Sequence, residues 1–362
     1  MSVVAVMAVD VYMGGGADLS KPTVKVYATF EDARMPLAEL PGYARRAESA
    51  GFDGLLVPEA THDPFIASTI AVANTSRIEV ATSVALAFVR SPVAVAYAAW
   101  DLQALSGGRF TLGLGSQIRA NIEGRFGLPW SAPVTRMRDY IGALRAAWDC
   151  WQNGTPLSFE SENYRLDRMQ PFFSPGPLDC GPPPVMLGSV RPAMSALAGE
   201  LADLFVTHPT NSDPRFLRER LIPTLDSAAT QGRPGIIAGA FVATGRNEHA
   251  VEAERERIRT YMGFLYSTPH YWPALQMRGL EELGMRLKSL ATAGDWENMT
   301  AAIDDDLMAE LVVAAPYDTA AGTVLSWYGE LVTAVCLRLP QDPADDGPLA
   351  EMVAELRGAD PV

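Results

Sequence analysis

The feature that most constrains the fold is a regular alternation of short apolar runs with segments of helical periodicity. The apolar runs cover residues 24–30, 54–58, 78–88, 109–114, 185–188, 204–207, 236–244 and 333–339. Between most of them, apolar residues recur at three- and four-residue steps, which is typical of helices packed on a sheet. Strands separated by helices pair in parallel through right-handed crossovers. Eight such runs favour an α/β fold of the closed (β/α)₈ TIM-barrel type over an open doubly wound sheet.

Two segments interrupt the alternation and predict insertions after the fourth and seventh strands. Residues 153–184 are rich in Pro and Gly with interleaved aromatics, and residues 261–316 separate the seventh strand from the last helix. We therefore expect one barrel domain over residues 23–340, an N-terminal arm over 1–22 and a polar C-terminal tail over 341–362 that ends in a surface helix. Residues 261–316 would form a lid over the barrel mouth, or alternatively a satellite core or a dimer face.

Composition excludes several classes of function. The formal net charge of −14 and the lack of a Lys/Arg cluster argue against nucleic acid as a partner. Cys150, Cys180 and Cys336 are too few and too scattered for a disulfide framework or a zinc site, so no metal is expected. The apolar stretch 2–11 lacks a basic flank and is too short to span a bilayer, which predicts a cytoplasmic protein without a membrane partner.

A flexible corner ends the fourth predicted strand at Gly115-Ser116. Small residues there let backbone N–H groups approach a ligand at the end of a barrel where α/β folds place their sites. This corner predicts part of a cofactor pocket, although a tight strand exit has the same signature. The chain contains no GxSxG, HExxH or Walker loop, and Gly113-Leu114-Gly115 lacks the third glycine of a Rossmann fingerprint.

Several motifs occur together in an order that resembles a known family. They are Ala50-Gly51-Phe52-Asp53-Gly54, the run Ser106 to Gly115, Arg138-Asp139-Tyr140, Pro183 to Gly188, and Ala198 to Asp203. The chain resembles the bacterial-luciferase-like flavin and deazaflavin oxidoreductases over most of residues 24–340. Within that family it looks most like the subgroup that depends on the deazaflavin coenzyme F420.

The resemblance implies a TIM barrel that holds an isoalloxazine-type ring at its C-terminal mouth. It also implies a non-prolyl cis peptide at the end of the third strand, which we place at Ala87–Phe88. The cofactor-binding residues that it implies are Thr61, Ala87, Phe88, Gly115, Ser116, Gln117, Asn121, Gly188, Ser189 and Val190. Ser189 belongs to a small-residue corner that suits a phosphate or ribityl chain at a helix N-terminus.

His62 is the predicted catalytic residue, since a neutral imidazole can donate or accept a proton near neutral pH. The subgroup's Asp-His pair reads Thr61-His62 here, so the histidine is kept and the acid is lost. A structural alternative is that Asp63 caps a helix beginning at Pro64, with His62 merely beside it. The subgroup's second acidic residue is replaced by Ile118, which leaves the substrate open.

The predicted substrate-binding residues are mostly aromatic. They are Trp130 in the loop after the fourth strand, His208 after the sixth strand, and His270, Tyr271 and Trp272 in the second insertion. Each has a packing role as its alternative.

These features together predict an F420-dependent oxidoreductase that transfers a hydride between the deazaflavin and a small organic substrate. One alternative is a luciferase-like monooxygenase that uses reduced FMN and dioxygen on the same scaffold. The other is a barrel without catalysis that serves as a cofactor-binding or assembly subunit. The expected partners are a small-molecule substrate, a flavin or F420 reductase that supplies reduced cofactor, and a second copy of the chain in a homodimer.

Overall fold

A closed parallel barrel forms the centre of the computed structural model, which describes residues 23–30 and 35–358. Its strands are β1 (Lys25–Thr29), β2 (Gly54–Val57), β3 (Glu79–Thr82), β5 (Phe110–Gly115), β8 (Val185–Ser189), β9 (Leu204–Thr207), β10 (Gly235–Ala238) and β13 (Ala334–Arg338). They follow the order β3-β2-β1-β13-β10-β9-β8-β5, and pairing of β3 with β5 closes the ring. The predicted TIM barrel is confirmed.

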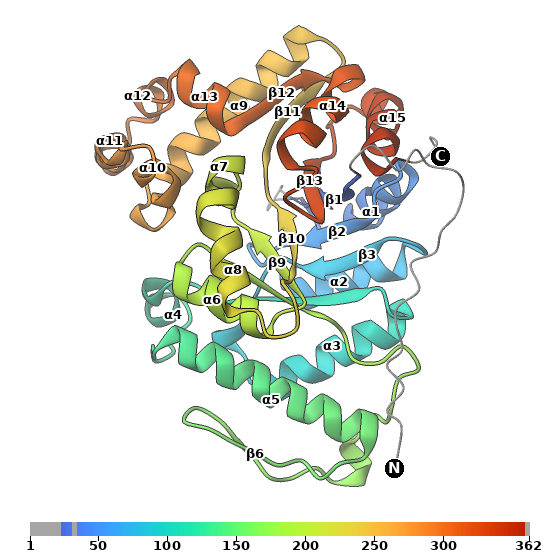
Figure 1. The fold of residues 1–362 in the computed structure, drawn as a ribbon. Helices are drawn as coiled ribbons and strands as arrows, with labels where there is room; N and C mark the ends of the chain where they lie inside the picture. Colours follow the sequence, from blue (N-terminus) through green and yellow to red (C-terminus); the bar gives the residue numbers. More distant parts are fainter. Residues whose placement is uncertain (1–22, 31–34, 359–362) are drawn as a thin grey trace.

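Helices surround this barrel on its outside (Figure 1). They are α1 (Leu40–Ser49), α2 (Pro64–Ala73), α3 (Pro92–Ser106), α5 (Pro133–Asn153), α6 (Pro192–Leu201), α7 (Pro214–Phe216), α8 (Ile222–Ala228), α14 (Tyr317–Tyr328) and α15 (Asp346–Arg357). Proline in the first turn starts many of them, where its missing N–H costs no hydrogen bond. Gly107, with φ of 65°, ends α3 in the left-handed conformation that glycine adopts readily.

Alternate residues of each strand face two different cores. A small cluster fills the barrel itself and includes Tyr27, Met186, Val206 and Cys336. Residues that point outward, such as Phe205 between Leu204 and Val206, join the larger core between barrel and helices. Because strands of this barrel are buried on both faces, they read as continuous apolar runs in the sequence.

The third predicted strand, residues 78–88, is divided in the structure. β3 ends at Thr82, a two-residue strand β4 (Ala85–Leu86) pairs with β5, and a 3-10 helix covers Ala87–Val89. The buried Thr82 hydroxyl accepts from Gly113 N and donates to Gly113 O, at 2.9 and 2.8 Å, and so ends the regular ladder there. Periodicity alone could not show this break, because Thr82 and Ser83 lie between two apolar runs with no Gly or Pro to mark a turn.

The seventh predicted strand is divided as well. β10 ends at Ala238, where the N–H of Gly239 donates to Thr207 Oγ1 at 3.0 Å instead of continuing the barrel ladder. β11 (Phe241–Gly245) then leaves the barrel and pairs in parallel with β12 (Val312–Pro316).

The second insertion lies between β11 and β12. It contains α9 (Glu248–Tyr266), α10 (Pro273–Gln276), α11 (Glu281–Ala293), α12 (Trp296–Ala301) and α13 (Asp305–Leu311). These elements surround a core of their own, which includes Met262, Leu287 and Met308. The insertion is therefore a satellite core, and Figure 1 shows its helices α10 to α13 grouped beside α7.

The first insertion is smaller and comes after α5. A hairpin of β6 (Phe159–Glu160) and β7 (Arg165–Leu166) lies along α5, where Gly142 leaves space for the ring of Phe159. A short helix, α4 (Arg119–Gly124), fills the loop after β5.

The C-terminal segment completes the barrel's outer layer. Beyond the predicted domain end at residue 340, α15 buries Leu349, Met352 and Leu356 in the main core, and Val24 N donates to Leu356 O at 3.0 Å. This segment is thus part of the barrel domain, and the domain extends past the predicted boundary. The predicted arm, residues 1–22, lies outside the described residues.

Candidate active site

The carboxyl ends of the barrel strands form the mouth, and the connection from β3 to β4 projects into it. The bond Ser83–Val84 is a cis peptide between non-proline residues. The prediction of a cis bond at this strand end is right, but its placement at Ala87–Phe88 is wrong. Ala87 and Phe88 have exposed fractions of 0% and 2% and lie in the main core, so neither offers a ligand a side-chain surface.

Val84 lies against the ends of the neighbouring strands β5 and β8 and packs on the cluster that fills the barrel. A methyl group at Gly115 would lie 2.5 Å from Val84 Cγ2, and one at Gly188 would lie 2.9 Å from Val84 Cγ1. Both approaches are shorter than carbon atoms tolerate, so the two strand ends can only carry glycine while Val84 lies between them. Gly115 and Gly188, predicted as cofactor contacts, therefore shape the floor of the mouth by admitting Val84.

His62 lies after β2, half-buried, and its Nε2 is 3.0 Å from Met35 O. Because a carbonyl oxygen only accepts, Nε2 carries the proton in this contact and the Nδ1 of a neutral ring can accept. Asp63 Oδ1 accepts from the N–H groups of Phe65 and Ile66 and caps α2. The helix cap foreseen as the alternative is thus present, and it leaves the His62 ring available. Thr61 beside it is exposed.

Hydrogen bonds within residues 116–121 fix the conformation of the loop after β5. Gln117 has φ of 58°, and its Oε1 accepts from Ile118 N at 2.9 Å and from Asn121 Nδ2 at 3.0 Å. The Ser116 hydroxyl donates to Gln117 O at 3.2 Å. The structure therefore brings Ser116, Gln117 and Asn121 together, with Asn121 oriented by Gln117.

His208 and Tyr271 form a stacked pair that joins the mouth to the second insertion. Their ring centroids are 4.1 Å apart and their planes differ by 3°. Nδ1 of His208 lies 2.8 Å from Thr210 Oγ1. Burial lowers the pKa of His208 to about 4, so the imidazole is neutral at pH 7.

The other predicted aromatic residues divide between surface and core. His270 is exposed, whereas Trp272 Nε1 donates to Tyr266 O at 2.6 Å and its ring occupies the space beside Gly284. Trp130 packs edge-to-face on Phe88 at 6.3 Å, against the main core. Of the insertion's three predicted substrate residues, Tyr271 alone contacts the predicted mouth residue His208 through its ring.

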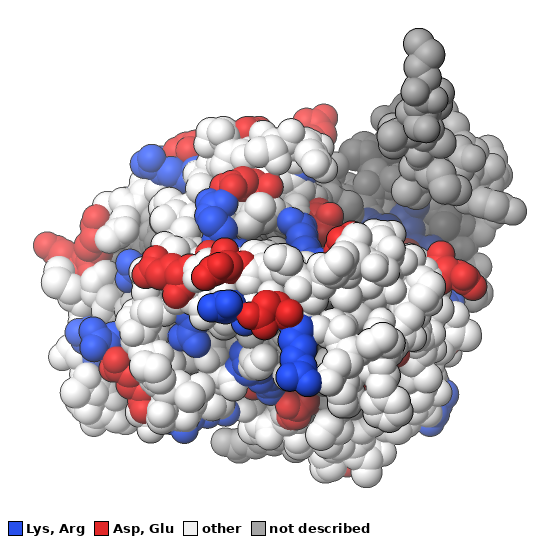
Figure 2. Space-filling view, turned by 90° about the horizontal axis from the view of Figure 1, so that it is seen from below, with Lys and Arg blue, Asp and Glu red and all other residues white. Residues whose placement is uncertain are grey.

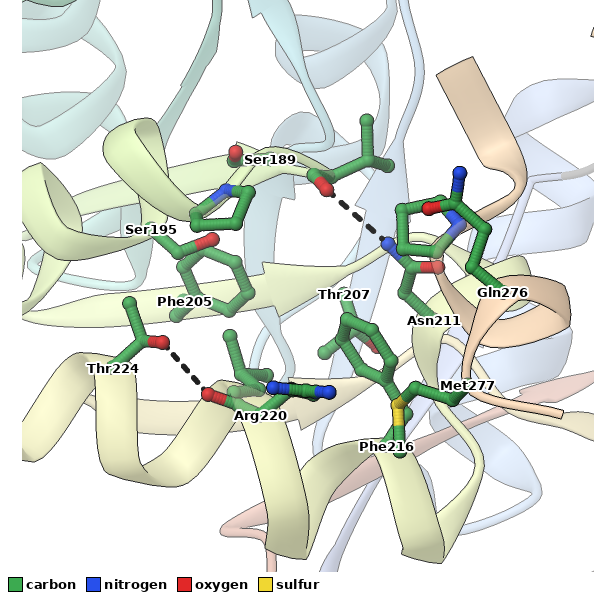
Figure 3. A pocket seen from close by; sticks show the side chains of 14 residues that line it. Ser189, Ser195, Phe205, Thr207, Asn211, Phe216, Arg220, Thr224, Gln276 and Met277 are labelled. Atoms are coloured by element: carbon green, nitrogen blue, oxygen red, sulfur yellow. Dashed lines mark hydrogen bonds between the residues drawn. The ribbon is translucent and has the colours of Figure 1, made fainter. Parts of the chain in front are cut away.

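A cavity of about 340 Å³ opens beside the mouth between α6 and α8, with α10 of the insertion as its outer wall (Figure 3). Ser189 and Val190 bound it at the end of β8, and its lining is mostly apolar. Asn211 is 3% exposed, and among the described residues its Oδ1 has no hydrogen-bond partner. Its Nδ2 donates to Val190 O at 3.4 Å. A buried acceptor without a donor, facing a cavity, is the kind of group that a bound ligand satisfies.

Arg220 reaches the same cavity from α8's side, and Figure 3 shows its guanidinium among the apolar lining residues. Within the described part of the chain this guanidinium has no ion-pair partner. Sequence reasoning missed Asn211 and Arg220, since their common cavity exists only where α10 of the insertion lies opposite α6 and α8.

Sequence reasoning also missed a group of charged residues that lies beside the connection from β3 to β4. Glu59, with an 8% exposed side chain, pairs with Arg90 at 2.8 Å, and Arg90 pairs with Asp63 at the same distance. The sequence did contain a signal for this ion pair: residues of opposite charge follow the second and third predicted strands, whose ends are neighbours in a parallel barrel.

The surface shows no concentration of one charge on the face drawn in Figure 2, where Lys and Arg alternate with Asp and Glu. Among the helices that the structure describes, none is long and apolar enough to cross a membrane. The described residues also include no group of three His, Cys, Asp or Glu side chains that could hold a metal ion.

A β/α barrel with this mouth defines an enzyme of the luciferase-like type, and sequence comparison agrees. The chain belongs to the luciferase-like monooxygenase family, whose sequence model matches residues 13–334. It is 41% identical over 293 residues to an uncharacterized protein of Mycobacterium tuberculosis, covering 80% of this chain and 86% of that one. It is 27% identical over 313 residues to a putative coenzyme F420-dependent oxidoreductase of the same organism, covering 79% and 86%.

Solved structures give the same fold. The coenzyme F420-dependent tetrahydromethanopterin reductase from Methanopyrus kandleri matches with a TM-score of 0.73 at 18% identity, over 93% of this chain and 98% of that one. The EDTA monooxygenase from Chelativorans matches with a TM-score of 0.71 at 13% identity, over 92% and 93%. An F420-dependent reductase and a monooxygenase thus share this fold.

Proposed function

We propose that this protein is an F420-dependent oxidoreductase that transfers a hydride between a deazaflavin and a small organic substrate. The observation that carries the proposal is its similarity to a relative named as a putative F420-dependent oxidoreductase, which covers most of both chains.

The residues at the mouth fit such a cofactor. Val84 offers an apolar surface between two glycine strand ends, which suits the face of a flat ring. The cavity beside Ser189 and Val190 would take the cofactor's side chain, with Asn211 Oδ1 accepting from a hydroxyl or N–H and Arg220 facing an anionic group. When bound, the deazaflavin supplies the carbon centre that donates or accepts the hydride.

The chain's own groups would orient the reactants and handle a proton. His62 Nε2 is held by Met35 O, so Nδ1 is the atom that would exchange a proton or hydrogen bond with ring or substrate. His208 stays neutral and, with Tyr271, forms a flat aromatic wall for substrate. Trp130 would contact the substrate only with the part of its ring that does not pack on Phe88.

A parallel fluorescence titration with coenzyme F420 and with FMN tests the proposal. We expect micromolar binding of F420 and binding of FMN at least about tenfold weaker, a difference of about 1.4 kcal/mol. Preference for FMN would favour the monooxygenase, for which oxygen consumption on turnover is the confirming readout. Binding of neither would contradict both enzymatic assignments and favour a subunit without catalysis.

Substitution of His62 tests its catalytic role once a substrate is found among reducible carbonyl and alkene compounds. Loss of a positioned acid–base group costs about 10²- to 10⁴-fold in rate. His62→Ala is therefore expected to lower kcat by at least about 100-fold while the Kd for F420 changes by less than about threefold. His249→Ala, which removes an exposed histidine near the start of α9, is the matched control. Unchanged kcat in His62→Ala would remove this residue from the mechanism.

We also propose that the protein is a homodimer and receives reduced cofactor from a separate reductase. Helix α2 supports the dimer: it carries no charged side chain over Pro64–Ala73, yet Ile66 on it is 55% exposed. Its exposed residues Ile66, Thr69 and Ala73 form an uncharged side, which another surface can cover without burying a charge.

A further inference from the structure

Glu59 holds the connection on which Val84 is carried. Its Oε2 accepts from Leu86 N at 2.8 Å and from Arg90 Nη1 at 2.8 Å, and its Oε1 accepts from Arg90 Nη2 at 3.0 Å. The side chain comes from the loop after β2, whereas Leu86 and Arg90 follow β3. One largely buried carboxylate therefore ties two neighbouring strand ends together.

Residues 82–83, which precede Val84, are fixed by hydrogen bonds between uncharged groups. Ser83 N donates to Val57 O at 2.7 Å, and the Thr82 hydroxyl is bonded to Gly113. Val84 thus lies between an anchor at residues 82–83 and an anchor at Leu86. Only the second anchor depends on a side chain outside the segment, since Val57 contributes its backbone.

Arg90 extends this anchor to helix α2. Its Nη2 donates to Asp63 Oδ2 at 2.8 Å, and Asp63 caps the helix with its other oxygen. The guanidinium lies 5.5 Å from the ring centroid of Phe65. Arg90 holds the pKa of Asp63 below its usual range, so this carboxylate remains charged and paired near pH 7. Arg90 therefore holds the Glu59 carboxylate in a defined position relative to Leu86.

We propose that Glu59 is a positioning residue for the cofactor ring: by accepting the Leu86 N–H it sets where Val84 lies on the floor of the mouth. The proposal rests on the proposed function, because the floor matters only if a ring lies on it. Glu59 itself has its oxygens occupied by Leu86 and Arg90, so it acts through Val84 and not on the reacting atoms.

Two substitutions separate the contact to Leu86 from the ion pair. Glu59→Gln keeps an oxygen for the Leu86 N–H and loses the charge, whereas Glu59→Ala loses both. Both variants should lower the Tm because both break the pair with Arg90, and Glu59→Ala should lower it further because it also leaves the Leu86 N–H without an acceptor. We expect the Kd for F420 to rise about tenfold in Glu59→Ala and less than about threefold in Glu59→Gln, since a buried N–H without an acceptor lets the segment shift.

Glu200→Ala is the matched control, because it removes a bidentate pair with Arg138 on α5 and α6, away from the mouth. It should lower the Tm without changing the Kd or the absorption spectrum of bound F420. Amide hydrogen exchange adds a readout without cofactor: exchange at Leu86 should be faster in Glu59→Ala than in Glu59→Gln.

The outcomes distinguish the two proposals. If the wild-type protein binds neither F420 nor FMN, the proposed function fails and the positioning role fails with it. If the wild type binds but Glu59→Ala binds equally well, or if Glu200→Ala weakens binding as much, the positioning role alone is wrong. Equal exchange at Leu86 in both Glu59 variants would also overturn it.

Discussion

At the scale of single residues, the close approach of Val84 explains why the strand ends at Gly115 and Gly188 carry glycine. Gly115→Ala would place its methyl group 2.5 Å from Val84 Cγ2, so Val84 has to move. Overpacking of this kind costs about 1–3 kcal/mol of unfolding free energy, and we expect a weaker affinity for F420 as well. Urea denaturation and the fluorescence titration measure the two effects.

Gly124→Ala is the control for that substitution, because no atom lies within 4 Å of the added methyl group. Alanine is the better helix former, so this variant should be as stable as the wild type or slightly more so. If Gly115→Ala behaved in the same way, the contact between Val84 and the strand end would not be limiting.

His208 gives a pH dependence whose sign follows from its burial. Its pKa is about 4 in the folded protein against an ordinary value near 6.5, so the unfolded chain takes up the proton first as pH falls. Stability from this group is fully present above about pH 6.5 and is lost between there and about pH 4, by no more than about 3 kcal/mol. His208→Gln should flatten the decline of unfolding free energy between pH 7 and pH 5.

A decline of unfolding free energy as steep in His208→Gln as in the wild type would show that other groups cause the acid sensitivity.

Many of the motif residues that carry the family resemblance serve the fold. Asp53 accepts from Val26 N at 2.8 Å, Asp203 accepts from Val185 N at 2.8 Å, and Arg109 donates to Ile78 O at 2.6 Å. These residues lie where strands begin, at the opposite end from the mouth. The resemblance therefore predicts the barrel well, and it says less about chemistry at the mouth.

At the scale of elements, the sequence predicted those strands and helices whose apolar pattern is strong. The β5 strand and the α3 and α5 helices lie close to where periodicity put them. The pattern predicts single strands over residues 78–88 and 236–244, because each is mostly apolar and contains no proline. What divides them is a contact distant in sequence, from Thr82 to Gly113 and from Thr207 to Gly239. The local sequence pattern does not indicate contacts between residues that lie so far apart in the chain.

The insertion is fastened to the barrel by a buried ion pair. Arg278 Nη2 lies 2.9 Å from Asp213 Oδ1, with side chains only 6% and 3% exposed. Arg278→Leu would leave the Asp213 carboxylate buried without its partner, which typically costs about 3–5 kcal/mol. We expect this loss in urea denaturation, together with faster proteolysis within residues 261–316.

The double variant Asp213→Asn/Arg278→Leu should recover most of that stability. Asparagine carries no charge and its oxygen can still accept from Phe216 N, as Asp213 Oδ1 does now. Arg215→Leu, which breaks an exposed pair with Glu219, should change the unfolding free energy by about 0.5 kcal/mol or less. A double variant as unstable as Arg278→Leu would contradict the view that the unpaired charge causes the loss.

At the scale of the whole molecule, the site is assembled from parts that are far apart in the chain. His62 follows β2, Ser189 ends β8, and the outer wall of the cavity at Met277 belongs to the insertion. The strand ends could be foreseen to meet, because all strands of a parallel barrel end at one mouth. The cavity could not, since it depends on where the insertion places α10 opposite α8, and no periodicity in the sequence gives that distance.

The proposed homodimer is the property of the whole molecule that is simplest to test. A stable homodimer buries at least about 1,200 Å² in total, with a core depleted of charge, and the uncharged outer side of α2 suits such a core. Ile66→Asp would bury an unpaired carboxylate there, so we expect sedimentation velocity at micromolar concentration to show a monomer where the wild type is a dimer. Met285→Asp is the matched control, because Met285 is 54% exposed on α11 of the insertion, and it should remain dimeric. A monomeric wild type would refute the dimer itself, whereas a dimeric Ile66→Asp would move the interface away from α2.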